Sequence, residues 1–207
     1  MNLNPYISRI NTRIVKRKYV DDNTHLALAN DITLDYEALN SFNEDIYVNN
    51  TLVDQRYNSS YGNIFVSKYR PENDQIHLSI DYDTRIMLLR SLTLRYLIFS
   101  ILRKYMNLKV YGFATDRLNS SFRIDKVYFE YQAREIINFL ERVIPIYVES
   151  GLEIVTKESE NGPITKIPGI YFGKSLCPHL SNLSEIGKFE ISHYSFGKNG
   201  ITVYYNN

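Results

Sequence analysis

The longest apolar stretch of the sequence, Ile86 to Met106, constrains the fold more than any other feature. A membrane-spanning helix needs about 20 mostly apolar residues without charges. Four basic residues interrupt this stretch instead: Arg90, Arg95, Arg103 and Lys104. Its apolar side chains fall almost all around a helix, which is typical of a helix buried in a core. We therefore predict a central helix that is capped by Asp83 or Thr84 and ends near Asn107, and no membrane partner.

A second long helix is predicted over Gln132–Ser150. Its inward-facing positions recur at helical spacing: Ile136, Ile137, Leu140, Val143 and Ile144. Pro145 should kink this helix or end it early, because proline lacks the backbone N–H that the helix needs. Gly151 is the expected stop signal, since glycine favours the position after a helix.

The first residues predict a short amphipathic helix with a basic face. Asn4-Pro5 suits a helix start, and Ile7, Ile10 and Ile14 share one face up to about Tyr19. The opposite face, continued by Lys18, carries Arg9, Arg13, Lys16 and Arg17. These residues could contact phosphates or an acidic partner. The alternative is a solvated face, which the formal net charge of +1 favours over a nucleic-acid surface.

The remaining elements are predicted strands. Short apolar runs between turn residues place them at Ile46–Val48, Asn63–Arg70, Ile76–Tyr82, Leu108–Thr115, Phe122–Glu130, Leu152–Thr156, Ile164–Ile167, Gly169–Phe172, Phe189–Phe196 and Ile201–Tyr205. Turn residues at 71–74 and 197–200 predict two hairpins. We expect a further short helix at 33–42 and mostly loop at 43–62.

These elements predict an α+β fold: a mixed or antiparallel sheet with hairpins, packed against two long helices and the short N-terminal helix. The sequence contains no convincing linker, so we expect one domain over residues 1–207. The first thirteen residues lack the apolar core of a secretion signal. The chain has one cysteine, Cys177, which fits a reducing compartment. The expected location during synthesis is therefore the cytoplasm.

The common catalytic and cofactor motifs are missing from the sequence. It has no phosphate-binding glycine loop, no zinc-protease motif and no paired Cys-x-x-Cys. Cys177 lies two residues from His179, but a nucleophile needs a base that the fold positions, so we do not expect catalysis there. Asp81 and Asp83 could bind a metal beside a helix start, although one of them more often caps the helix. We predict no catalytic residue, metal or cofactor.

Two short motifs nevertheless suggest an enzyme as the alternative. His77-Leu78-Ser79 and His179-Leu180-Ser181 resemble the paired His-x-Ser/Thr motifs of two-histidine phosphoesterases, and His193-Tyr194-Ser195 is a third match. The resemblance implies that His77 and His179 meet in a cleft as general base and general acid. It implies a cyclic nucleotide or an RNA end as the substrate. That role needs imidazoles that titrate near neutral pH.

The leading functional hypothesis rests on composition. The chain is rich in Asn, Ile and Tyr, with 18 tyrosines and no tryptophan, which indicates an AT-rich genome such as that of a phage. Tyrosine is favoured at protein interfaces, and several tyrosines lie in predicted loops: Tyr47, Tyr57, Tyr61 and Tyr69. We therefore expect a structural subunit of a large assembly, most simply a tail, neck, connector or baseplate component of a virion. Its partners would be identical copies and other assembly subunits.

Overall fold

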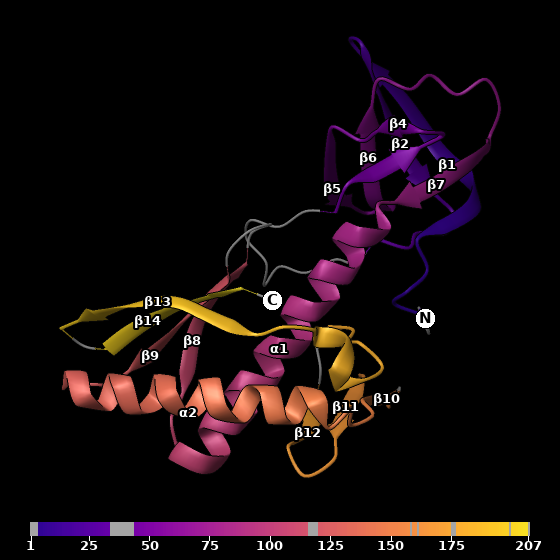
Figure 1. Ribbon diagram of the computed structural model, residues 1–207. Coiled ribbons are helices and arrows are strands. Elements are labelled where there is room, and N and C mark those ends of the chain that lie inside the picture. Colours follow the sequence, from indigo (N-terminus) through magenta and orange to yellow (C-terminus); the bar gives the residue numbers. More distant parts are fainter. Residues whose placement is uncertain are drawn as a thin grey trace. The chain divides into compact units, whose positions relative to one another are not determined.

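The computed structural model describes residues 4–33, 44–115, 120–157, 159–160, 162–174, 177–198 and 200–206. The chain divides into two compact units, and the division falls within the first helix (Figure 1). Unit 1 holds the described residues up to Ile86, and unit 2 holds those from Met87 onward. Each unit has its own antiparallel sheet. The expected single domain over residues 1–207 stays a prediction.

The predicted fold class is wrong, because the chain is mostly β, with 43% strand and 27% helix. The N-terminal segment is not a helix but the strand β1 (Arg9–Val20). Ile10 and Ile14 are four residues apart, a spacing that fits both a helix face and a strand face. Thr12 decides between the two periods, since Thr12 and Ile14 are both buried while the intervening Arg13 is exposed.

The sheet of unit 1 contains six further strands: β2 (Asn23–Leu28), β3 (Ile46–Val48), β4 (Thr51–Leu52), β5 (Gln55–Ser59), β6 (Gly62–Ser67) and β7 (Gln75–Ile80). Their order is β4-β3-β7-β1-β2-β6-β5, so the two edge strands are neighbours in sequence. Between them, the Val53 N–H donates to the Ile46 carbonyl and the Asp54 N–H to the Val66 carbonyl, both at 2.8 Å. The sheet therefore curls until its two ends share one stretch of chain.

β1 makes this curl possible because it pairs on two sides. Its first half, Arg9 to Arg13, pairs with β7, and its second half pairs with β2. The register shifts between Ile14 and Lys16, and such a bulge bends a strand. The interior is filled by apolar side chains: Ile14, Leu26, Leu28, Ile32, Ile46, Val48, Phe65, Ile76, Leu78 and Ile80.

The strand predictions in unit 1 succeed only in part. The strand at Ile46–Val48 is confirmed, but the expected loop at 43–62 also contains β4 and β5. β6 and β7 lie close to their predicted positions, yet they do not form the predicted hairpin. β6 pairs with β2 and β5, and β7 pairs with β1 and β3. The long bent β1 offers partners that are distant in sequence, so the turn at 71–74 does not decide the pairing.

Both long helices are confirmed as α1 (Tyr82–Met106) and α2 (Glu130–Glu149). α2 continues through Pro145, so the early end is wrong. Ile144 and Val148 on either side of the proline are both buried, and this burial favours a continued helix over the lost hydrogen bond. Gly151 follows the helix with a φ of 59°, which confirms the predicted stop.

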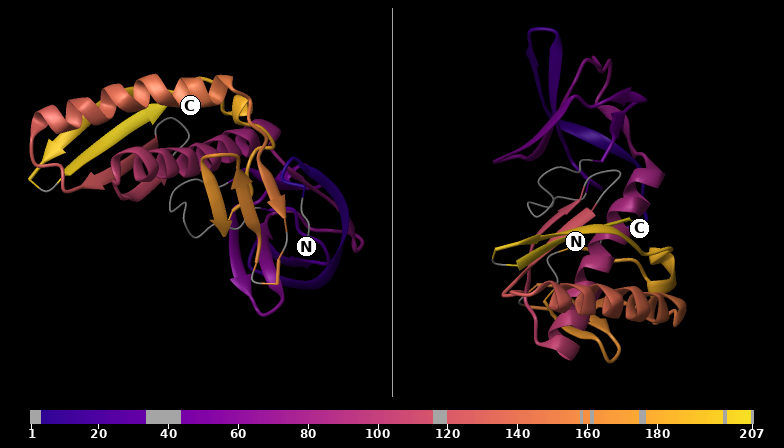
Figure 2. Two further views of the ribbon diagram at one scale, coloured as in Figure 1. Left: turned by 90° about the horizontal axis from the view of Figure 1, so that it is seen from below. Right: turned by 60° about the vertical axis from the view of Figure 1, so that its left-hand side comes forward.

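Unit 2 is built on the strands β8 (Val110–Thr115), β9 (Ser120–Asp125), β13 (Glu190–Gly197) and β14 (Gly200–Asn206). Their order is β13-β14-β9-β8 and every neighbouring pair is antiparallel. The predicted terminal hairpin is therefore confirmed. α2 runs along β13 and β14 (Figures 1 and 2). One face of the sheet is buried at Phe122, Val203 and Tyr205, and the other face is partly exposed, for example at Thr202 and Tyr204.

Smaller elements complete unit 2. A three-stranded sheet contains β10 (Val155–Lys157), β11 (Ile164–Ile167) and β12 (Tyr171–Lys174). A 3₁₀ helix, η1, spans Leu183–Ile186. The helix predicted at 33–42 falls almost wholly on residues outside the described part of the chain. Neither helix of the described residues is both long and apolar enough to cross a membrane.

Candidate functional site

The predicted basic face is not one surface in the structure. Arg9 and Arg13 point to the same side of β1, because they lie an even number of residues apart in its first half. Beyond the bulge, Arg17 donates to Asp74 Oδ1 at 2.6 Å. Lys16 instead places its Nζ 3.7 Å from the centre of the Tyr61 ring. The strand thus separates the four residues that a helix would have grouped.

The two histidines of the phosphoesterase hypothesis lie in different units. His77 is on β7 of unit 1, and its Nδ1 is 3.0 Å from Asn11 Oδ1. His179 is buried in unit 2, where its ring meets Tyr96 edge to face at 4.7 Å between centroids. Burial lowers the pKa of His179 to about 4, so this imidazole is neutral at pH 7. The third match, His193, is exposed and stacks on Tyr204. Convergence of His77 and His179 stays untested.

The carboxylates at the start of α1 serve the helix. Asp81 Oδ1 accepts the Thr84 N–H at 2.8 Å, so Asp81 caps the helix in place of the expected Asp83 or Thr84. A depression of about 290 Å³ lies beside it, lined by side chains that include Arg9, Tyr47 and Ser79. Among the described residues, no three His, Cys, Asp or Glu side chains come together as metal ligands.

A buried ion pair in unit 1 is the largest feature that the sequence interpretation missed. Arg85 and Glu44 are joined through both the Nε and the Nη2 of the arginine, and both side chains are almost fully buried. The Arg85 Nη1 donates to the Pro5 and Ile7 carbonyls, and its Nη2 also donates to the Ile32 carbonyl. Every N–H of the guanidinium therefore has an acceptor. The available signal was an arginine on the first turn of the helix, directly before the apolar run Ile86 to Leu89.

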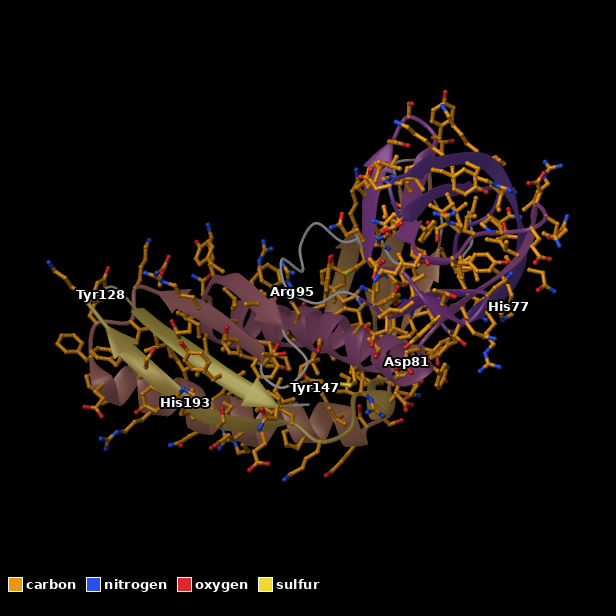
Figure 3. The ribbon with its side chains drawn as sticks, turned by 90° about the horizontal axis from the view of Figure 1, so that it is seen from above. His77, Asp81, Arg95, Tyr128, Tyr147 and His193 are labelled. Carbon is orange, nitrogen blue, oxygen red and sulfur yellow. The ribbon has the colours of Figure 1, made fainter. Side chains whose placement is uncertain are left out.

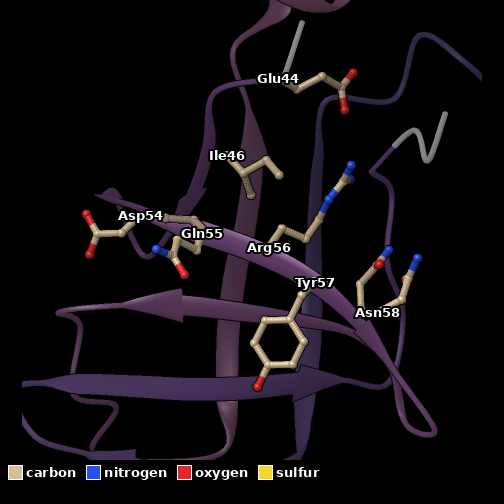
Figure 4. A pocket seen from close by; sticks show the side chains of 9 residues that line it. Glu44, Ile46, Asp54, Gln55, Arg56, Tyr57 and Asn58 are labelled. Carbon is tan, nitrogen blue, oxygen red and sulfur yellow. The ribbon is translucent and has the colours of Figure 1, made fainter. Parts of the chain in front are cut away.

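A pocket of about 170 Å³ lies next to Glu44 and is lined by residues of β3, β5 and β6 (Figure 4). Its strongest polar groups are engaged within unit 1. The Glu44 carboxylate binds Arg85, and the Asn63 amide donates to Asp31 Oδ2 at 2.6 Å. We therefore interpret the pocket as part of the structural polar network around Arg85.

Four exposed aromatic residues gather at one end of unit 2, and we call them the aromatic ledge: Tyr128, Phe129, Tyr131 and Phe196. They are 60%, 57%, 66% and 42% exposed, respectively. The Phe129 and Tyr131 rings stack with centroids 5.6 Å apart. The backbone beneath them is fixed, because the N–H groups of Tyr128 and Phe129 both donate to Gln132 Oε1. The backbone at Tyr128 and Phe129 is thus tied to the first turn of α2.

The contacts of Arg134 show that β13 lies next to the start of α2, where the ledge is. Arg134 on α2 pairs with Glu130 at 2.8 Å and also hydrogen-bonds the Tyr194 side chain, and both contacts raise the pKa of Arg134. Phe196 lies two residues beyond Tyr194 on the same side of β13. The β13–β14 turn and the start of α2 lie at the same end of unit 2, where Figure 3 labels Tyr128. Sequence analysis assigned residues 128 and 129 to a strand and so missed the ledge.

No protein-family model matches the sequence, and no curated protein matches it significantly.

Proposed function

We propose that this chain is a structural subunit of a protein assembly and that identical copies contact one another through the aromatic ledge. The carrying observation is the exposure of four aromatic side chains at one end of unit 2, two of which, Phe129 and Tyr131, stack on each other. Single exposed apolar residues are ordinary on protein surfaces, whereas a contiguous exposed apolar patch marks an interaction site.

The chemistry of the ledge suits a protein interface. Aromatic side chains are enriched at the centres of interfaces, where they supply large contact areas. Tyr128 and Tyr131 also carry hydroxyl groups that can hydrogen-bond at the rim of a contact. The ledge needs little ordering upon association, since Gln132 already holds its backbone. A preorganised surface loses less conformational entropy on binding.

A phage virion is the assembly that the composition favours. The abundance of Asn, Ile and Tyr supports an AT-rich source, and a tail, neck, connector or baseplate is built from repeated copies of such subunits. Head-to-tail contacts between copies form a ring when the rotation between neighbours closes, and an open filament when it does not. The ledge would then meet a different surface on the neighbouring copy.

The native mass of the purified chain tests this proposal. We expect light scattering over a range of concentrations to show a defined oligomer or an increase in mass with concentration. The double variant Phe129→Ser/Tyr131→Ser should shift this equilibrium toward the monomer by at least about tenfold, because interface aromatics commonly contribute about 2 kcal/mol or more.

Phe172 provides the matched control. It is 76% exposed on β12 and lies outside the ledge, so Phe172→Ser should leave the oligomer unchanged. A wild-type chain that stays monomeric at every concentration would contradict contact between identical copies. An equal effect of both variants would contradict the assignment of that contact to the ledge.

A further inference from the structure

The second half of β1 contributes to an exposed face of unit 1 that also includes β2, β6 and β5. Lys16 pairs with Ala27, Ala27 with Ile64, and Ile64 with Tyr57. Residues directly opposite each other in an antiparallel sheet point to the same face. Lys16 and Tyr57, which are distant in sequence, therefore belong to one surface.

The next row of the same face adds a second lysine and a histidine. Lys18 pairs with His25, and His25 pairs with Val66. The His25 Nδ1 is 3.1 Å from the Tyr57 hydroxyl, so the two rows are joined by a side-chain contact. Gln55 ends this row on β5. None of the eight residues in the two rows is acidic.

Two tyrosine rings flank the face. Tyr57 is 47% exposed, and Tyr61, in the β5–β6 turn, is 56% exposed. Figure 4 shows the Tyr57 ring pointing away from the Arg56 guanidinium, as the alternation of a strand requires. Lys16 lies over the Tyr61 ring, and its proximity lowers the pKa of that phenol. Lysine and tyrosine are thus interleaved on one surface.

Between these side chains lies a floor of small and aliphatic residues. Ala27, Ile64 and Val66 are 1%, 7% and 5% exposed, although they point to the outer face. We call the whole surface the tyrosine–lysine face: Lys16, Lys18, His25, Tyr57 and Tyr61 around the floor of Ala27, Ile64 and Val66. It combines positive charge with exposed rings, and the apolar residues beneath them are themselves buried.

We propose that the tyrosine–lysine face binds single-stranded nucleic acid. Proteins that bind single strands combine cationic side chains for the phosphates with aromatic rings on which bases stack. Lys16 and Lys18 supply the charge, and Tyr57 and Tyr61 supply the rings. Duplex bases are already stacked on one another, so a duplex cannot use the rings. The face lies in unit 1 and the ledge in unit 2, so either surface can fail its test without the other.

Fluorescence anisotropy with a labelled 15-nucleotide oligothymidylate or oligouridylate tests this proposal on the full chain. Tyr57→Leu and Tyr61→Leu should each weaken binding by about tenfold, as expected for the loss of one stacked base. Lys16→Gln/Lys18→Gln should reduce the slope of log affinity against log salt by about 1.4, because two phosphate contacts are lost. An unlabelled duplex should compete at least about tenfold less well than the single strand.

Arg9→Gln/Arg13→Gln is the matched control, because it removes the same charge from the same strand outside the two rows. This variant should keep most of the wild-type affinity. Absence of binding at low salt would overturn the proposal. An equal loss of affinity in the control variant would also overturn it. So would an affinity that neither tyrosine substitution changes and for which heparin competes as well as the single strand, because charge alone would then explain the binding. Circular dichroism must show that each variant is folded.

Discussion

The two units of the chain bury different kinds of polar side chain: one buries a charged ion pair, and the other buries a neutral histidine. Unit 1 buries an ion pair, Arg85–Glu44, with every donor of the arginine satisfied. Unit 2 buries His179 as a neutral imidazole among apolar and aromatic side chains. A satisfied ion pair depends on both partners, whereas a neutral buried histidine depends on pH. The difference predicts that the two units fail under different perturbations.

Removal of the ion pair should have the largest effect on stability. Arg85→Ala leaves the buried Glu44 carboxylate and three backbone carbonyls without their donor, and we expect unit 1 to lose about 3–5 kcal/mol. Hydrogen exchange should show the loss in the strands of unit 1. Arg85→Met/Glu44→Leu should recover part of the stability, since no uncompensated charge remains. If the free energy of unfolding of Arg85→Ala were within about 1 kcal/mol of the wild-type value, the ion pair would not be a major source of stability in unit 1.

Acid should destabilise unit 2 through His179. The folded-state pKa of about 4 lies below the ordinary value of 6.5, so the unfolded chain binds a proton that the folded chain does not. The free energy of unfolding should therefore fall as the pH drops from 6.5 to 4, by about 3 kcal/mol from this group. His179→Phe should lack this component in urea titrations at pH 7 and pH 4. Parallel pH dependence of variant and wild type would show that the histidine is not buried and neutral.

Close contact between strands should make unit 2 sensitive at Gly200. A Cβ at this position would lie 2.1 Å from the Ile124 carbonyl oxygen, so Gly200→Ala must displace β14 from β9. We expect a cost of about 1–3 kcal/mol in thermal melting. Gly197→Ala is the control in the same hairpin, because its Cβ would meet its nearest atom at 3.7 Å. Equal melting temperatures for the two variants would show that β14 and β9 are farther apart at Gly200 than the structure places them.

The smallest effect is expected from the second ion pair of unit 1. Arg17 and Asp74 are 2.6 Å apart, but the Asp74 side chain is 67% exposed. Asp74→Asn should cost less than about 1 kcal/mol, and high salt should abolish the difference. Urea titrations at low and high salt measure both quantities. If Asp74→Asn lowered the free energy of unfolding as much as Arg85→Ala, burial would not explain the difference in strength between the two ion pairs.

The sequence predicts the two long helices better than the first strand. A long apolar pattern is compatible with only one type of secondary structure, whereas a short pattern fits several. The stretch around Ile86 to Met106 is too long and too apolar for anything but a buried helix. Ile10 and Ile14, by contrast, fit either period, and the burial of Thr12 together with pairing to β7 shows that the segment is a strand. The error then grouped Arg9 with Lys16, because a helix places both on one face and a bulged strand does not.

The candidate surfaces depend on pairings that are remote in sequence. Tyr57 and Tyr61 were singled out as tyrosines in predicted loops, yet their proximity to Lys16 follows from the register of β1, β2, β6 and β5. Phe196 joins the ledge only because α2 runs back along β13. Glu44 and Arg85 are likewise brought together by the fold. A single sequence does not show which strands pair when they are far apart along the chain. The candidate residues could therefore be named from the sequence, but their neighbours in space could not.

Hydroxyl-radical footprinting of the aromatic ledge tests the central claim most directly, because it reports the exposure of individual side chains. Oxidation of Tyr128, Phe129 and Tyr131 should fall severalfold as the concentration rises through the range in which the native mass increases. Oxidation of Phe172, which is 76% exposed and lies outside the ledge, should stay constant over that range. An oligomer whose ledge residues are oxidised at the monomer rate would contradict the account, because copies would then meet through another surface.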